Sequence, residues 1–156
     1  MNIEVIELSS CPEHLETIGA WIYNEWWRTK IKGEDFLEIL RKHTEKGSFP
    51  FTIVAIEDEV PVGSCCVIEN DCELRPQYTP WVAAVFVKPE RRCYGIASRI
   101  LQEAIRVAKN QGINGLYIDC WAKTAHVYEK NGWAIFEKDV GQKDSLIMYQ
   151  RISNEP

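Results

Sequence analysis

Residues 81–108 constrain the fold of this chain more than any other stretch. They begin with a nearly continuous apolar run, Trp81–Val87, of the kind found in strands buried on both faces of a sheet. The chain then turns through Pro89 and Gly95, after which apolar residues recur at helical spacing. Another buried strand, Gly115–Trp121, is predicted next. Two interior strands with an amphipathic helix between them indicate a sheet on which that helix packs.

The rest of the chain supplies further strands and helices to the same unit. No repeat, low-complexity tract or linker interrupts their order, which predicts one domain over residues 1–156. The fold class is α/β, a mixed sheet with helices on its faces. The additional predicted strands cover residues 3–8, 51–56, 62–69, 133–140 and 144–152, and the additional predicted helices cover residues 12–27, 34–46 and 124–131.

The composition is that of a globular, water-soluble protein. Of the 156 residues, 46% are hydrophobic and 26% are charged, and no apolar stretch is long enough to cross a bilayer. The N-terminal segment has no basic patch followed by an apolar block, so we expect no signal peptide and a cytoplasmic location. The net charge of −5 argues against binding to a phosphate backbone. We therefore expect neither nucleic acid nor a membrane as a partner.

The six cysteines lie mostly in apolar, strand-like segments, and they form no C-x-x-C pair. In a chain without a signal peptide this pattern predicts reduced thiols in the core and not a disulfide framework. The three histidines lie far apart and lack the spacing of metal ligands. We expect no metal site.

The turn between the central strand and the helix after it has the features of an anion site. A helix that begins there presents backbone N–H groups and the positive end of its dipole. Gly95 lets a ligand approach the backbone closely, and Arg91 and Arg92 add positive charge. These features favour a diphosphate, although a similar turn in many α/β proteins holds no ligand.

Two motifs resemble those of a known superfamily. Residues 92–97 fit R-x-x-G-x-A, which resembles the Q/R-x-x-G-x-G/A signature of the GNAT N-acetyltransferases, and "VYEKNGW" (residues 127–133) resembles their later YEKxGF segment. The resemblance implies a central mixed sheet of about seven strands flanked by about four helices. It also implies that two parallel central strands, residues 81–87 and 116–120, splay apart to hold acetyl-CoA.

By this resemblance, acetyl-CoA is the acyl donor and no metal is needed. The pantetheine arm would pair with backbone groups around Val85 and Val87, and the pyrophosphate would lie on the amides of residues 92–97. Cys93 and Tyr94 stand where a glycine and a basic or polar residue are frequent, and Thr124 stands where asparagine is common. The predicted cofactor-binding residues are Val85, Phe86, Val87, Arg92, Cys93, Tyr94, Gly95, Ile96, Ala97, Ser98 and Thr124.

Acetyl transfer to an amine needs a polarised thioester, a base for the amine and an acid for the departing thiolate. The resemblance assigns the acid to Tyr128 and the polarising N–H to the backbone near Phe86. Glu69, Asp71 and Glu73 lie on or just after the strand that precedes the central one, and Glu69 is the first choice for the base. Alternatively, Tyr128 packs with its hydroxyl at the surface, and the carboxylates are solvated loop charges.

The acceptor pocket is expected between the first two helices and residues 75–81. Trp27 falls at the end of an aromatic-rich helix and is the residue of that helix expected to face a ligand, while Trp81 closes the second segment. Aromatic residues at helical spacing can equally belong to the core. Trp27 and Trp81 are therefore predicted substrate-binding residues.

The sequence thus predicts an acetyl-CoA-dependent N-acetyltransferase. The acceptor would be a primary amine of a small molecule, such as an amino sugar, an aminoglycoside-like compound or a polyamine, or of a peptide. The first alternative is a non-catalytic acyl-CoA sensor or interaction domain, and the second is a nucleotide-binding regulator that uses the same anion site. The β-rich C-terminus could pair across a homodimer.

Overall fold

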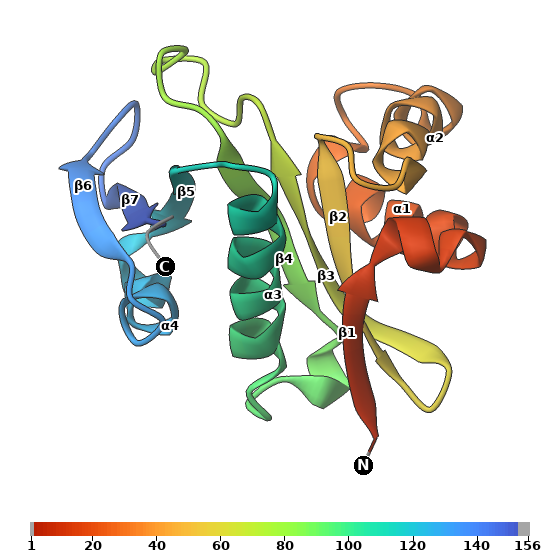
Figure 1. Cartoon of the computed structure of the whole chain (residues 1–156). Helices are drawn as coiled ribbons and strands as arrows, with labels where there is room; N and C mark the ends of the chain where they lie inside the picture. Colours follow the sequence, from red (N-terminus) through yellow and green to blue (C-terminus); the bar gives the residue numbers. More distant parts are fainter. Residues whose placement is uncertain (1, 153–156) are drawn as a thin grey trace.

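The computed structural model describes residues 2–152, and one mixed sheet organises it. The strands are β1 (Ile3–Glu7), β2 (Phe51–Glu57), β3 (Val60–Ile68), β4 (Trp81–Val87), β5 (Gly115–Trp121), β6 (Ala134–Lys138) and β7 (Ser145–Arg151). They lie in the order β1-β2-β3-β4-β5-β7-β6 (Figure 1). Neighbouring strands are antiparallel except β4 and β5, which are parallel because a helix connects them across one face.

Helices cover both faces of the sheet (Figure 1). Their bounds are α1 (Leu15–Ile22), α2 (Gly33–Arg41), α3 (Ile96–Asn110) and α4 (Ala125–Glu129). Helices α1 and α2 share one hydrophobic cluster with residues such as Val54, and α3 and α4 share another with residues such as Ile53. Because Ile53 and Val54 are adjacent in β2, they point to opposite faces of the sheet. No helix of the described chain is long and apolar enough to pass through a bilayer.

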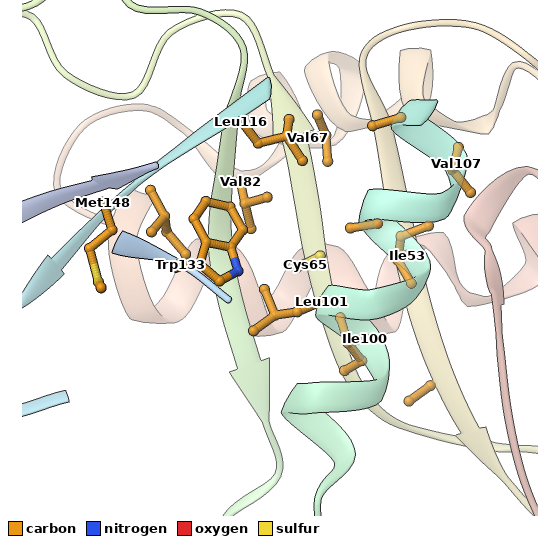
Figure 2. Close-up of a cluster of buried hydrophobic side chains, with 14 of the residues drawn as sticks. Ile53, Cys65, Val67, Val82, Ile100, Leu101, Val107, Leu116, Trp133 and Met148 are labelled. Carbon is orange, nitrogen blue, oxygen red and sulfur yellow. The ribbon is translucent and has the colours of Figure 1, made fainter. Parts of the chain in front are cut away.

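The larger cluster lies between α3 and the sheet. Figure 2 shows Ile100 and Leu101 of α3 extending toward Ile53 and Cys65, and all four side chains are fully buried. Trp133 closes the same cluster from the segment after α4, and it is 3% exposed. The helical spacing of apolar residues in α3 therefore corresponds to the face that packs on the sheet.

The predicted order of elements is confirmed, and the differences lie at their ends. Trp81–Val87 and Gly115–Trp121 have the predicted bounds. The predicted helix over residues 34–46 instead begins at Gly33 and ends at Arg41, before a short 3-10 turn. The helix predicted over residues 12–27 consists of a 3-10 turn, α1 and a π-helical turn, Tyr23–Trp27.

The π-helical turn joins α1 to α2. The rings of Tyr23 and Trp27 lie 6.0 and 5.7 Å from the ring of Phe36 in α2. The Tyr23 hydroxyl also donates a hydrogen bond to the Ile31 backbone oxygen at 2.8 Å. The wider turn thus lets two aromatic side chains pack on one residue of the next helix. Turns of this kind are rare and frequently occur at functional sites.

Strands β4 and β5 pair only where the first residues of β4 meet the middle of β5. They pair at two positions, Trp81 with Tyr117 and Val82 with Ile118. Farther along β4, Ala84 has a φ of 54° and the register with β3 shifts, which marks a β-bulge. A bulge bends its strand, so β4 turns away from β5 beyond this point. The predicted splay between two parallel strands is confirmed.

The six cysteines are free thiols, but they do not all lie in the core. Cys11, Cys65 and Cys66 are buried, as the apolar sequence around them indicates. Cys93 is exposed, because it lies in the loop before α3, with a φ of 68°. The expectation of core thiols is therefore wrong for Cys93.

Candidate functional site

The splay leaves one edge of β4 open. At the opposite edge, the Lys88 N–H donates to the Val62 backbone oxygen of β3 at 2.9 Å. Because amide groups alternate between the two edges of a strand, the Phe86 N–H points to β3 and the Val87 N–H points to the open edge. The Val87 carbonyl accepts a hydrogen bond from Arg92 Nε at 2.9 Å. An extended ligand at this edge can therefore pair with backbone groups of Val87.

The loop before α3 forms a nest of backbone amides at the end of that edge. Gly95 has a φ of 78°, and a Cβ placed there would meet nothing within 4 Å. Among residues 2–152, the amides of residues 93–98 donate to no backbone carbonyl. Left-handed Gly95 directs these amides toward one point at the start of α3, where the helix dipole adds positive potential. This geometry suits a phosphate or diphosphate.

The two arginines of this loop have different roles. Arg91 donates from Nε and NH2 to Glu57 of β2 at 2.9 and 2.5 Å, and its guanidinium lies 4.6 Å from the ring of Tyr94. Arg92 is exposed, and its guanidinium lies 5.9 Å from the ring of Phe86. The charge of Arg91 is offset by Glu57, so Arg92 contributes more of the positive potential at this site.

One side chain, that of Asn131 just after α4, joins α4 to α3. Asn131 Nδ2 donates to Ser98 Oγ at 3.0 Å and to the Val127 backbone oxygen at 2.8 Å. At the start of α4, Thr124 Oγ1 donates to the Trp121 backbone oxygen at 3.0 Å. Ser98 and Thr124 are thus engaged within the protein, and they hold α4 in place beside β5 and α3.

Tyr128 of α4 is half-buried, and its ring lies 6.4 Å from the ring of Trp133. Burial and, to a smaller extent, the thiols of Cys120 and Cys65 raise the pKa of its phenol to about 12. Within residues 2–152 the hydroxyl makes no hydrogen bond to another protein group, and water can reach it. Tyr128 therefore carries a proton across the physiological pH range and can donate it to a ligand atom.

A pair of aspartates lies on the opposite side of the sheet from Tyr128. Asp119 is the first residue of β5 beyond the last pair with β4, and its side chain points to the α1 and α2 face because Ile118 points to the α3 face. Burial and, to a smaller extent, the charge of Asp119 raise the pKa of Asp71 to about 7, and Lys30 opposes the rise. Burial also raises the pKa of Asp119. Both aspartates are nevertheless exposed at the surface, so the neighbouring protein atoms restrict their hydration without sealing them from solvent.

The predicted base and acceptor residues have different surroundings. Glu69 is exposed just after β3. Trp27 is half-buried, with Lys30 Nζ 5.1 Å from its ring and the ring of Phe36 packed at 5.7 Å. Trp81 is fully buried, and its indole N–H donates to the Tyr78 backbone oxygen at 2.6 Å. Trp81 can therefore contribute to acceptor binding only by supporting the wall of the acceptor pocket from beneath.

Sequence analysis missed two features of this region. Asp119 lies inside a buried strand, and its lone charge among apolar neighbours is a signal that we did not use. The second feature joins Arg75 and Tyr78 to Glu137, which lies about sixty residues later in the sequence. No local pattern indicates that pairing, because it depends on how β6 is placed beside the loop.

A sequence model of the acetyltransferase (GNAT) family matches residues 13–133. The match includes both motifs, the splayed strands and the first two helices. No curated protein sequence matches the chain.

Solved structures share the fold over nearly the whole chain. An acetyltransferase of the GNAT family from Streptococcus pneumoniae is 17% identical, with a TM-score of 0.72 over 97% of this chain and 100% of its own. An aminoglycoside 6'-N-acetyltransferase complexed with coenzyme A is 14% identical, with a TM-score of 0.71 over 100% and 99%. A Salmonella typhimurium protein solved with its cofactor acetyl-CoA is 16% identical, with a TM-score of 0.71 over 100% and 96%. At these identities the likeness shows a common fold.

Proposed function

Because the chain belongs to the GNAT acetyltransferase family, we propose that it transfers the acetyl group of acetyl-CoA directly to a primary amine. The single observation that carries this proposal is the open edge of β4, which leads to the unbonded amides before α3. One element offers an extended backbone for a pantetheine arm, and the next offers N–H groups for a diphosphate. Coenzyme A contains these two parts in that order.

The donor would lie between β4 and β5. Its pantetheine would form backbone hydrogen bonds at Val85 and Val87. A pantetheine N–H would replace Arg92 as the donor to the Val87 carbonyl, and the Arg92 guanidinium could then approach the diphosphate. The diphosphate would lie on the amides of residues 93–98. This arrangement extends the acetyl group toward the bulge, where an N–H of a neighbour of Phe86 on the open edge of β4 would polarise the thioester carbonyl, because the N–H of Phe86 itself points to β3.

The chemical step needs a proton for the leaving sulfur. The amine nitrogen attacks the thioester carbonyl carbon, a tetrahedral intermediate forms, and the carbon–sulfur bond then breaks. Tyr128 would donate its phenolic proton to the departing thiolate. Support for this role is that the hydroxyl is unbonded within the described chain and remains protonated, with a pKa of about 12.

The amine must lose a proton before or during attack, and two carboxylates are candidates for the base. Glu69 is the first choice from the sequence. Asp71 has the stronger structural support, because burial and Asp119 raise its pKa to about 7, close to the pH at which a general base works well. We assign the base to Asp71 and keep Glu69 as the alternative.

The acceptor would be a cationic small molecule or a peptide amine. Asp71 and Asp119 place negative charge beside the splay, and the chain as a whole has a net charge of −5. Amino sugars, aminoglycoside-like compounds and polyamines match that charge. The half-buried ring of Trp27 would form part of the wall. We further propose that the protein acts in the cytoplasm, binds no nucleic acid and can form a homodimer.

Two measurements test the proposed function. Calorimetric titration with acetyl-CoA, coenzyme A and ATP should show binding of the first two, since ATP lacks a pantetheine arm to occupy the edge of β4. Thiol release from acetyl-CoA should then depend on an added amine from a panel of amino sugars, polyamines and peptides. Binding without thiol release would support an acyl-CoA sensor, and binding of ATP alone would support a nucleotide-binding regulator.

A further inference from the structure

The loop that joins β3 to β4, residues 69–80, is fastened to the far edge of the sheet by one carboxylate. Arg75 donates from Nε to both carboxylate oxygens of Glu137 at 3.1 Å, and from NH2 to Oε2 at 2.8 Å. Glu137 lies in β6, the edge strand. Two parallel hydrogen bonds from a guanidinium to a carboxylate fix orientation as well as distance.

Tyr78 makes a further connection to the same carboxylate. Its hydroxyl donates to Oε1 of Glu137, and its ring is stacked on Tyr117 of β5 with centroids 4.8 Å apart and an angle of 7°. The Tyr78 carbonyl accepts the indole N–H of Trp81 at 2.6 Å. Glu137, Tyr78 and Tyr117 therefore form a continuous contact from the edge strand to the strand of the splay.

Backbone turns transmit this constraint to Asp71. The Arg75 N–H donates to the Cys72 backbone oxygen at 3.1 Å, and the Tyr78 N–H donates to the Arg75 backbone oxygen at 3.1 Å. Asp71 directly precedes the first of these turns. A loop held at Arg75 and Tyr78 has little freedom at Asp71, because the intervening residues are already bonded to one another.

The groups that face Asp71 come from three other parts of the chain, one of which is β3 with the buried thiol of Cys66, whose pKa the charge of Asp71 helps to raise. Asp119 belongs to β5 and raises the pKa of Asp71, and Lys30 follows the π-helical turn and lowers it. The loop therefore brings its carboxylate between β5 and the segment after α1. A shift of the loop would change both the distance from Asp71 to Asp119 and the access of water to Asp71.

We infer that Glu137 is a positioning residue for acceptor binding, because it holds the loop of residues 69–80 so that Asp71 faces Asp119 at the splay. This inference rests on the proposed function. Glu137 itself lies outside the reacting groups and acts through Arg75 and Tyr78. The sequence places it on an edge strand, where an acidic residue would otherwise serve only to discourage strand pairing.

A second ion pair with almost the same local geometry provides a matched control. Arg106 donates from Nε to both oxygens of Glu103 at 3.0 Å, within the single helix α3. That pair joins residues three apart, whereas Arg75 and Glu137 join separate elements. Glu103→Gln removes a comparable charge pair without releasing any loop.

The test compares Glu137→Gln with Glu103→Gln by hydrogen exchange and by kinetics. Exchange at the amides of Arg75 and Tyr78 should rise in Glu137→Gln and stay at the wild-type rate in Glu103→Gln. With spermidine, glucosamine and a lysine peptide as probe acceptors, Glu137→Gln should raise the KM of the best acceptor about tenfold or more, while the KM of acetyl-CoA stays the same. The acid limb of kcat/KM for that acceptor should move to lower pH, since a released Asp71 gains water and its pKa falls.

Further variants separate the inferred role of Glu137 from a general loss of folding. Tyr78→Phe keeps the stacked ring and removes only the hydroxyl, so it should reproduce the acceptor effect in weaker form. The double variant Arg75→Gln/Glu137→Gln should be no worse than Glu137→Gln alone, because that substitution already removes the partner of Arg75. Equal exchange in Glu137→Gln and Glu103→Gln, or an unchanged acceptor KM, would overturn the inference. If the wild-type protein releases no thiol with any amine, the proposed function fails instead, and the exchange result still shows whether the carboxylate holds the loop.

Discussion

Arg91 and Glu57 form an ion pair in which two guanidinium nitrogens donate to one carboxylate oxygen, and this pair joins the turn before α3 to β2. The two nitrogens of Arg91 lie 2.9 and 2.5 Å from Glu57 Oε2, and both side chains are less than one fifth exposed. The turn that contains Arg91, Pro89–Arg91, leads directly into the amide nest of residues 93–98. The position of the proposed diphosphate site is thus fixed by a residue of a distant strand.

Glu57→Gln should lower the free energy of unfolding by about 1–2 kcal/mol, because it leaves a partly buried guanidinium with a neutral partner. Urea unfolding followed by circular dichroism measures this. Glu103→Gln, which removes a more exposed pair within α3, should cost less than about 0.5 kcal/mol. Equal losses in the two variants would show that Arg91 finds another partner and that Glu57 has no particular structural role.

Tyr128→Phe should lower kcat by about a hundredfold or more, since it removes the proton donor for the thiolate. The Kd of acetyl-CoA, measured by calorimetry, should stay within about threefold of the wild-type value, because the diphosphate and pantetheine contacts lie elsewhere. Tyr149→Phe is the matched control, because its ring belongs to the aromatic cluster of β5, β6 and β7. A wild-type rate in Tyr128→Phe would remove the phenol from the mechanism.

Local sequence patterns predict most of the sheet and one half of the candidate site. The apolar runs of β4 and β5 and the spacing in α3 are strong signals, since burial on both faces or on one helical face leaves few alternatives. The amide nest follows from a strand, Gly95 and a helix in succession, all within one short segment.

The acceptor side depends on tertiary contacts that no local pattern contains. The surroundings of Asp71 combine charges from β5 and from the segment after α1, and the loop that carries it is held by Glu137. The spacing of apolar residues does not predict the π-helical turn either, because its residues Tyr23 and Trp27 pack on Phe36 of another helix. The sequence around Glu69 and Asp71 therefore does not show that Asp119 of a distant strand acts on Asp71.

His43 should make the protein less stable in acid. It is 5% exposed, its Nδ1 lies 2.8 Å from Thr52 Oγ1, and burial lowers its pKa to about 4. The pKa of His43 is lower in the folded than in the unfolded chain. Its contribution to the free energy of unfolding is therefore fully present above about pH 6.5 and is lost as the pH falls toward 4. The loss could reach about 3 kcal/mol. Relative to His43→Gln, which does not titrate, wild-type stability should therefore rise between pH 4 and 6.5 in urea unfolding experiments, and a constant difference would contradict this.

Asp71→Asn should have opposite effects on activity and stability. Loss of the proposed base should lower kcat/KM for the acceptor by about a hundredfold. Because burial and Asp119 raise the folded pKa of Asp71 to about 7, folding becomes less favourable as the pH rises from about 4 to 7. Removing the charge should therefore raise the unfolding midpoint in urea at pH 8 and leave it unchanged at pH 4. Glu69→Gln, two residues before Asp71, should change neither property. If Glu69→Gln abolishes activity and Asp71→Asn retains it, the base is Glu69, and the raised pKa of Asp71 serves another purpose.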